Sequence, residues 1–153
     1  MLCYRPIQES YVDLVGVDCY DLVRSEPELS WEERKTAQNR RLHAEHPEWL
    51  WVLEREETVF GFVTFWLPPE RHYGHIDNNG VHPHEAGRGW ATFMYSEVLR
   101  HFRRQGLRFA HVDTGLDDAH LPARRAYEAV GFGRRVPTVA YSQRLADVDR
   151  GAQ

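Results

Sequence analysis

The most constraining feature of this sequence is a strand-like run that ends at a proline and leads through two glycines into a long apolar helix. It occupies residues 79–92, with Pro83 as the stop and Gly87 and Gly89 before the helix. Glycine lets the backbone approach a ligand closely because it has no Cβ. The first N–H groups of a helix point outward, and the helix dipole favours an anion there. The stretch therefore predicts a phosphate cradle, although many short Gly-x-Gly loops only turn the chain.

A second pattern lies downstream, in residues 123–132. Its apolar positions recur at i, i+3, i+4 and i+7, which is one face of a helix; they are Ala123, Ala126, Tyr127 and Val130. Gly131 then predicts the end of that helix, and Phe132 the start of a strand.

Together the two stretches resemble motifs of the GNAT superfamily of acyl-CoA-dependent N-acyltransferases. That family carries Val-x-Pro, then Arg/Gln-x-x-Gly-x-Gly/Ala, and later Asn-x-x-Ala-x-x-x-Tyr-x-x-x-Gly-Phe. The matching residues are Val81, Pro83, Gly89, Ala91, Ala123, Tyr127, Gly131 and Phe132. Two positions depart from the pattern, because Ala86 stands where Arg or Gln is usual and His120 where Asn is usual.

The resemblance implies that acetyl-CoA binds as the acyl donor, with its pyrophosphate on backbone N–H groups and its amide arm beside the strand. Ala86 supplies such an N–H as well as Arg would. His120 either replaces the family Asn or is an ordinary loop histidine. The implied cofactor-binding residues are Asn79, Gly80, Val81, Gly87, Arg88, Gly89, Trp90, Ala91, Thr92, His120 and Arg124.

The resemblance also implies a direct transfer of the acetyl group to a primary amine, without a nucleophile on the enzyme. Tyr127 occupies the place of the family tyrosine that protonates the departing thiolate; the alternative is a core aromatic on an apolar helix face. Asp77 or His75, on the strand beside the thioester, is the candidate base, and Asp77 is the one we favour. The alternative for Asp77 is a solvated carboxylate near a strand end.

The remaining pattern predicts an α/β fold with a mixed, mostly antiparallel sheet flanked by helices, as in the GNAT architecture. Helices are expected over residues 10–24, 30–46, 90–105 and 121–130, and strands over residues 2–7, 49–53, 59–67, 72–82, 107–114, 132–135 and 138–144. The Asn78-Asn79-Gly80 segment is either a hairpin turn or a β-bulge with Gly80 at positive φ. We favour the bulge, which would splay the central strand away from its neighbour.

Composition limits the alternatives. The 153 residues predict one domain over residues 1–145 and a tail over 146–153, and a net charge of −4 argues against a nucleic-acid-binding surface. There is no apolar run of the roughly 20 residues that a spanning helix needs. Cys3 and Cys19 are expected to be reduced thiols, so a cytoplasmic protein without a membrane partner is predicted. A homodimer is an open option that the resemblance suggests.

Three other functions remain as alternatives. One is a non-catalytic acyl-CoA-binding or sensing domain of the same fold, and another is a nucleotide-binding module that uses the glycine loop. The third is a zinc site built from His72, His75, His82 and His84. Because Pro83 separates two of these histidines and no ligand spacing recurs, no metal is expected. The sequence does not identify the acceptor amine, which a small molecule or a peptide could carry.

Overall fold

The computed structural model describes residues 31–68, 70 and 72–139 of the chain. The elements predicted over residues 2–7 and 10–24, most of the last predicted strand and the tail lie outside the described residues. No helix within the described ranges is long and apolar enough to cross a membrane.

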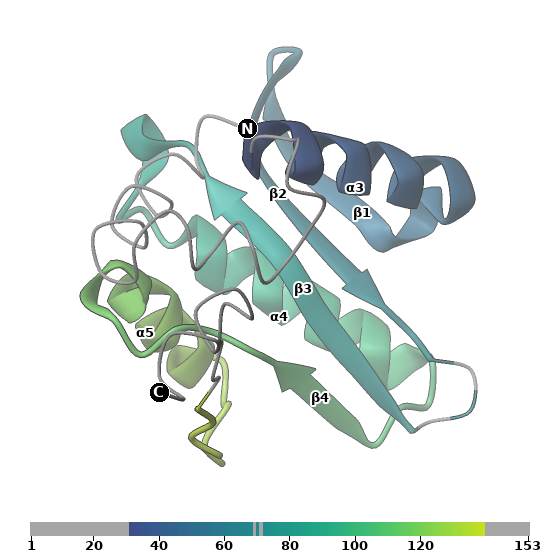
Figure 1. The fold of residues 1–153 in the computed structure, drawn as a ribbon, viewed down its shortest axis with the longest axis vertical. Helices are drawn as coiled ribbons and strands as arrows, with labels where there is room; N and C mark the ends of the chain where they lie inside the picture. Colours follow the sequence, from purple (N-terminus) through teal and green to yellow (C-terminus); the bar gives the residue numbers. More distant parts are fainter. Residues whose placement is uncertain (1–30, 69, 71, 140–153) are drawn as a thin grey trace, which may run out of the picture.

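The described elements follow one another as a helix, three strands, a helix, a strand and a helix (Figure 1). They are α3 (Trp31–Glu45), β1 (Leu50–Arg55), β2 (Thr58–Trp66), β3 (Tyr73–Val81), α4 (Trp90–Arg104), β4 (Phe109–Val112) and α5 (Leu121–Ala129), with short 3-10 turns at Pro47–Trp49, Pro83–Glu85 and Asp118–His120. The strands form one sheet in the order β1-β2-β3-β4, antiparallel except for the parallel pair β3–β4. This confirms the mixed α/β fold and the helices predicted over residues 30–46, 90–105 and 121–130.

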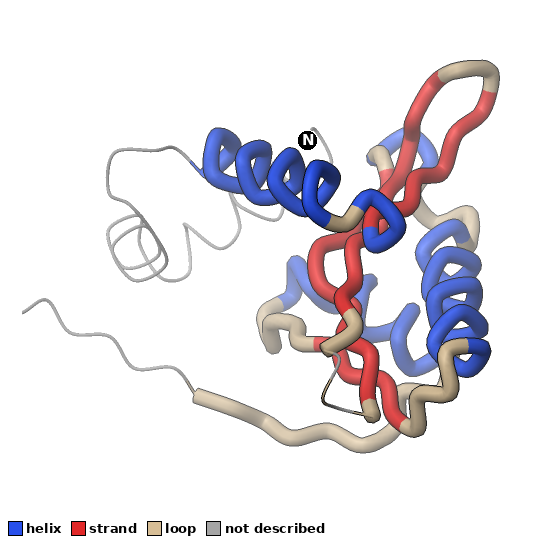
Figure 2. The backbone as a smooth tube through the Cα atoms, turned by 90° about the vertical axis from the view of Figure 1, so that its right-hand side faces the viewer, coloured by secondary structure: helices blue, strands red, loops and turns tan. Residues whose placement is uncertain are grey.

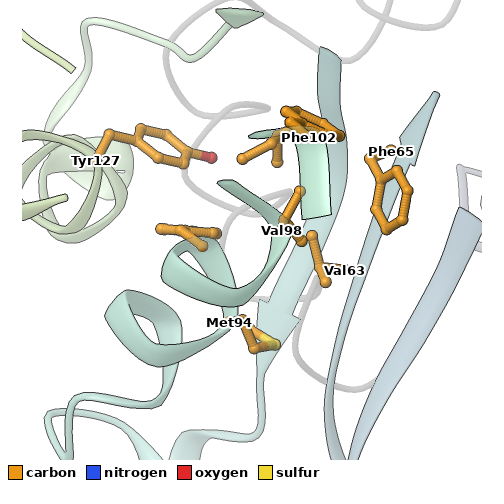
Figure 3. Packing of buried hydrophobic residues seen from close by; sticks show 8 residues of the cluster. Val63, Phe65, Met94, Val98, Phe102 and Tyr127 are labelled. Atoms are coloured by element: carbon orange, nitrogen blue, oxygen red, sulfur yellow. The ribbon is translucent and has the colours of Figure 1, made fainter. Parts of the chain in front are cut away.

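The sheet has a helix on each side, with α3 over one face and α4 over the other (Figure 2). The core lies between α4 and the sheet, because α4 carries its apolar side chains in one stripe. Its buried residues are Val63, Phe65, Ile76, Met94, Tyr95, Val98, Phe102 and Tyr127, the last from α5 (Figure 3). Gly106, at φ 75°, takes the left-handed conformation that ends α4.

The hairpin predicted between β1 and β2 is confirmed, and its turn is unusual in composition. Glu56 and Glu57 both have positive φ, 49° and 62°. Two consecutive left-handed residues match the right-handed twist of the flanking strands, but Asn and Gly usually occupy such positions.

The β-bulge is real but lies elsewhere than predicted. Val63 pairs with Asn79 and Phe65 with Ile76, so one residue of β2 faces two residues of β3, Asp77 and Asn78. Gly80 pairs regularly with Phe62 and is not among the glycines with positive φ, so its predicted role was wrong. The buried Thr64 side chain holds the bulge instead: its Oγ1 accepts from the Asn78 N–H (2.9 Å) and donates to the Asn78 carbonyl (3.1 Å).

Beyond the bulge, β3 loses one of its neighbours. Its pairing with β4 runs from Tyr73–Phe109 to Ile76–Val112 and stops there. Residues 77–81 are therefore paired with β2 on one side only, among the strands described here. This is the predicted splay of the central strand, and it leaves backbone N–H and C=O groups at an open edge.

Two predicted strands differ from the structure. The strand expected over residues 107–114 is confined to Phe109–Val112, and residues 132–135 run without strand pairing. The segment expected as a loop at residues 117–120 contains a 3-10 turn that Asp117 caps at its start. Both strand predictions depended on distant partners, which local sequence does not specify.

Candidate functional site

The glycine loop before α4 is left-handed at both of its glycines. Gly87 and Gly89 have φ values of 74° and 81°, and no other atom lies within 4 Å of the place where a Cβ would be. Gly89 is the N-cap of α4 and offers no side-chain cap, while the Phe93 N–H makes the first helical bond, to the Gly89 carbonyl (2.9 Å). The N–H groups of Trp90, Ala91 and Thr92 therefore lie at an open helix start, the geometry that suits an anion.

Glu85 organises the side chains of this loop, and the sequence analysis missed it. Its Oε2 accepts from the Trp90 indole and from Arg88, each at 3.1 Å, and its Oε1 lies 3.4 Å from Arg55. The hydrogen bond from Trp90, with help from the two arginines, lowers the pKa of Glu85. Glu85 thus fixes the directions of Arg88 and Trp90. The spacing of Glu85 three residues before Arg88 was the available signal.

Tyr127 lies in a buried polar cluster at the open half of β3. It is 5% exposed, and its hydroxyl accepts a hydrogen bond from Asn79 Nδ2 at 2.9 Å. The Tyr95 hydroxyl donates to Asn79 Oδ1 at 2.6 Å, and the two tyrosine rings are 4.6 Å apart. Asn79 on β3 therefore joins a tyrosine of α4 to a tyrosine of α5.

The direction of these hydrogen bonds is fixed by the backbone. Asn79 Nδ2 also lies 3.2 Å from the Asp77 carbonyl, which can only accept, so the amide nitrogen must face Asp77 and Tyr127. Tyr127 is thus the acceptor in its bond with Asn79, and that bond does not use its hydroxyl proton. Burial raises the pKa of Tyr127 and the charge of Asp77 adds to the rise, while contact with the Tyr95 side chain and the hydrogen bond from Asn79 oppose it.

Asp77 lies at the bulge, under α3. Its Oδ2 accepts from Asn78 Nδ2 (2.6 Å) and from Gln38 Nε2 (3.3 Å), and Lys35 Nζ donates to Asn78 Oδ1 at 2.7 Å. Asn79 links the two predicted catalytic residues, because its Nδ2 lies 3.2 Å from the Asp77 carbonyl and 2.9 Å from the Tyr127 hydroxyl. The contacts of Lys35 and Gln38 with β3 could not be predicted from the sequence, because α3 is mostly charged and has no clear apolar face.

His75 lies two residues before Asp77. It stacks on Trp66 with ring centres 4.8 Å apart, and burial lowers its pKa below 6.5 although Asp113 and Asp77 oppose the shift. The four histidines considered as a zinc site do not form one group: His82 and His84 stack on each other, whereas His75 neighbours His111.

His120 ends the 3-10 turn before α5, and Arg124 lies in the first turn of α5. His120 Nδ1 is 2.6 Å from Asp117 Oδ2, and Arg124 Nη1 donates to the carbonyls of Gly115 (2.6 Å) and Asp117 (2.7 Å). The structure thus gives Arg124 a role in holding the loop before α5, which the sequence analysis did not foresee.

Gly80 and Val81 pair with Phe62 and Gly61 of β2, so their other backbone edge is the open one. Tyr95 was missed because it occupies an apolar helix face and no local signal distinguishes it from a core residue.

The fold and the loop can be compared with known proteins. The family model described as Acetyltransferase (GNAT) family matches residues 16–132. None of the curated proteins matches the chain. Among solved structures, a putative acetyltransferase of the GNAT family from Desulfovibrio desulfuricans is 21% identical, with 80% of this chain and 81% of that chain covered and a TM-score of 0.60.

Two further structures extend the comparison. A mutant of the BH1408 protein from Bacillus halodurans is 18% identical, with 92% and 89% of the two chains covered and a TM-score of 0.63. The aminoglycoside N-acetyltransferase AAC(6')-Iy, in complex with the bisubstrate analogue CoA-S-monomethyl-acetylneamine, is 18% identical, with 83% and 90% covered and a TM-score of 0.56. These similarities concern the fold. The family match, which spans most of the chain and includes both the glycine loop and Tyr127, shows that this protein belongs to the acetyltransferase (GNAT) family.

Proposed function

We propose that the protein transfers an acetyl group directly from acetyl-CoA to a primary amine of a small molecule. The observation that carries this proposal is the Asn79-held hydroxyl of Tyr127, which lies beside the half of β3 that has no strand on its outer side within the described residues. The open helix start at Gly89 supports the same function, because backbone N–H groups there suit the pyrophosphate.

The binding part of the proposal assigns three roles. The N–H groups from Gly87 to Thr92 hold the pyrophosphate, and the open edge of Asn79, Gly80 and Val81 takes the amide arm as an added strand would. Arg88 and His120 are proposed as additional contacts to acetyl-CoA. A helix start contributes about 0.3–1 kcal/mol per favourable charge, so the arm must supply much of the affinity.

The chemical step follows from the two groups near residue 79. The amine nitrogen attacks the thioester carbonyl, the C–S bond breaks, and Tyr127 gives its hydroxyl proton to the departing sulfur. Asp77 accepts the proton that the amine loses, through a water molecule. The hydrogen bond from Asn79 favours the phenolate that Tyr127 becomes, which counters the effect of burial on its pKa.

The acceptor is proposed to be cationic. The face of β3 and β4 that carries Asp77 also carries Asp113, and two carboxylates attract an ammonium group. An acceptor screen begins with small polyamines and, because one similar structure is an aminoglycoside N-acetyltransferase, with aminoglycosides.

The first test is a calorimetric titration with acetyl-CoA, with ATP and NAD as controls, followed by a screen of amines for thiol release. We expect selective binding of acetyl-CoA near micromolar, about −8 kcal/mol. Absence of binding to the folded protein would refute the cofactor site and the transferase with it.

The second test separates an enzyme from a binding domain. We expect Tyr127→Phe to keep acetyl-CoA affinity and to lower kcat by about 100-fold or more, the usual contribution of a general acid. Tyr73→Phe, on the same strand as Asp77, is the matched control and should leave kcat unchanged. Full activity of Tyr127→Phe would show that Tyr127 is not the acid, and binding without turnover of any amine would favour the sensing domain.

A further inference from the structure

A group of metal-binding side chains lies where β3 and β4 run in parallel. His75 and His111 are register partners on the two strands, so their side chains leave the same face of the sheet side by side. Asp113 follows His111 by two residues and returns to that face. The strand pairing itself therefore brings two imidazoles and a carboxylate together.

The distances between these groups are short. His111 Nε2 lies 3.2 Å from Asp113 Oδ1, and His75 Nε2 lies 3.9 Å from Asp113 Oδ2. One ligand atom from each of the three residues lies within 4.8 Å of the others, and this is the only such group among the residues that the structure describes.

We propose that His75, His111 and Asp113 bind one divalent transition-metal ion, of which Zn²⁺ is the natural probe. Zinc bonds to imidazole nitrogen and carboxylate oxygen are about 2.0–2.2 Å long, so two ligands of one tetrahedral ion are roughly 3.3 Å apart. The His111–Asp113 distance already has this value, and small side-chain rotations bring in His75. This set shares only His75 with the four histidines considered from sequence.

The surroundings suit an accessible ion. The His75 side chain is 12% exposed and its ring is held against Trp66, so one ligand is fixed in place. The side chains of His111 and Asp113 are 56% and 75% exposed, which provides a route of entry. With three protein ligands, a fourth position stays open to water or a small molecule, as in catalytic rather than structural zinc sites.

The simpler explanation is that Asp113 only accepts a hydrogen bond from His111 and lies near His75. The two explanations differ in what they predict for metal binding and not in any effect on activity. The site shares Asp113 with the face proposed to attract the acceptor, but zinc binding is measured without acetyl-CoA or an amine. Its failure and the failure of the transferase are therefore separate results.

The test is a calorimetric titration of the untagged protein with Zn²⁺, repeated with Co²⁺ and followed by visible absorption. We expect one ion per chain and a cobalt spectrum of four-coordinate type. His111→Ala and Asp113→Asn should each weaken binding at least ~10-fold, since even residues that only orient a ligand contribute that much. Both positions are exposed, so the variants are expected to fold, which circular dichroism checks.

His84→Ala is the matched control, because His84 belongs to the other stacked histidine pair of the chain, with His82. It should leave zinc affinity unchanged. Absence of saturable binding, unchanged affinity in both ligand variants, or an equal loss in His84→Ala would each overturn the proposal.

Discussion

The two halves of β3 differ in what holds them. His75 and Ile76 are paired on both sides, with β2 and β4, whereas Tyr73 and Gly74 are paired with β4; Ile76 is fully buried against the core. Residues 77–81 are paired on one side only and are held by polar side chains that come from three other elements: Thr64 from β2, Tyr95 from α4 and Tyr127 from α5.

The difference shows how one strand serves both stability and function. Pairing with β4 occupies, along the whole first half, the backbone edge that a ligand would otherwise use. The bulge and the splay leave one backbone edge of the second half unpaired among the described strands. Hydrogen bonds from the polar side chains hold this half in place instead. If packing supports the first half and hydrogen bonds support the second, removing a buried apolar side chain should lower stability more than removing a single hydroxyl.

The first half should lose stability when its packing against the core is removed. Ile76→Ala deletes a side chain that is 0% exposed and is expected to lower the free energy of unfolding by about 2–5 kcal/mol. Urea unfolding measures this loss. Val59→Ala, on the exposed part of β2, is the control and should stay within about 0.5 kcal/mol. Equal losses at both positions would mean that the core does not hold this half.

The bulge should depend on one hydroxyl. Thr64→Val keeps the shape of the side chain but leaves the N–H and C=O of Asn78 without their partner, at a cost of about 1–3 kcal/mol. Turnover should fall with stability, because Asp77 and Asn79 flank Asn78. Thr58→Val at the exposed end of the same strand is the control. A stable Thr64→Val with normal kcat would show that the bulge forms without this contact.

Loss of the Tyr95 hydroxyl should lower kcat less than loss of the Tyr127 hydroxyl. Tyr95→Phe keeps the ring but removes the donor to Asn79 Oδ1, a bond worth about 0.5–1.5 kcal/mol. We expect kcat to fall about 2- to 12-fold, which is that energy expressed as a rate, with KM for acetyl-CoA unchanged. A fall as large as in Tyr127→Phe would instead identify Tyr95 as the proton donor.

The smallest effect concerns pH. Burial lowers the folded-state pKa of His75 below its unfolded value of 6.5, so the unfolded chain binds more protons between the two values. Stability should therefore rise with pH through this window and fall as the pH drops below 6.5. His75→Gln should flatten that fall between pH 7 and 5, measured by urea unfolding, whereas exposed His72→Gln should not. An unchanged slope in His75→Gln would show that His75 does not contribute to it.

The sequence predicted well what depends on neighbouring residues. The start of α4 and the end of α5 follow from the glycine positions and helix periodicity, and both are present. The parts that were wrong or missed depend on contacts between distant residues. The bulge was assigned to Gly80 because glycine favours bulges, but Thr64 of another strand sets its position.

The same limit applies to the site. Tyr127 was found through a motif, but its partners were not, because Asn79 and Tyr95 meet it only after β3, α4 and α5 have packed. Likewise, His75 and His111 are far apart in the sequence, and only the parallel register places them together. Local patterns carry no information about such a register.

The burial of Tyr127 also has a kinetic consequence. In the proposed cycle, its hydroxyl gives up a proton at each turnover and must be recharged before the next. Its side chain is 5% exposed, and Asn79 holds the hydroxyl beside residues 77–81, along the path proposed for the cofactor arm. In the proposed cycle, the Tyr127 phenolate is therefore reprotonated only after CoA has left. Product release and reprotonation of the acid then occur as one step.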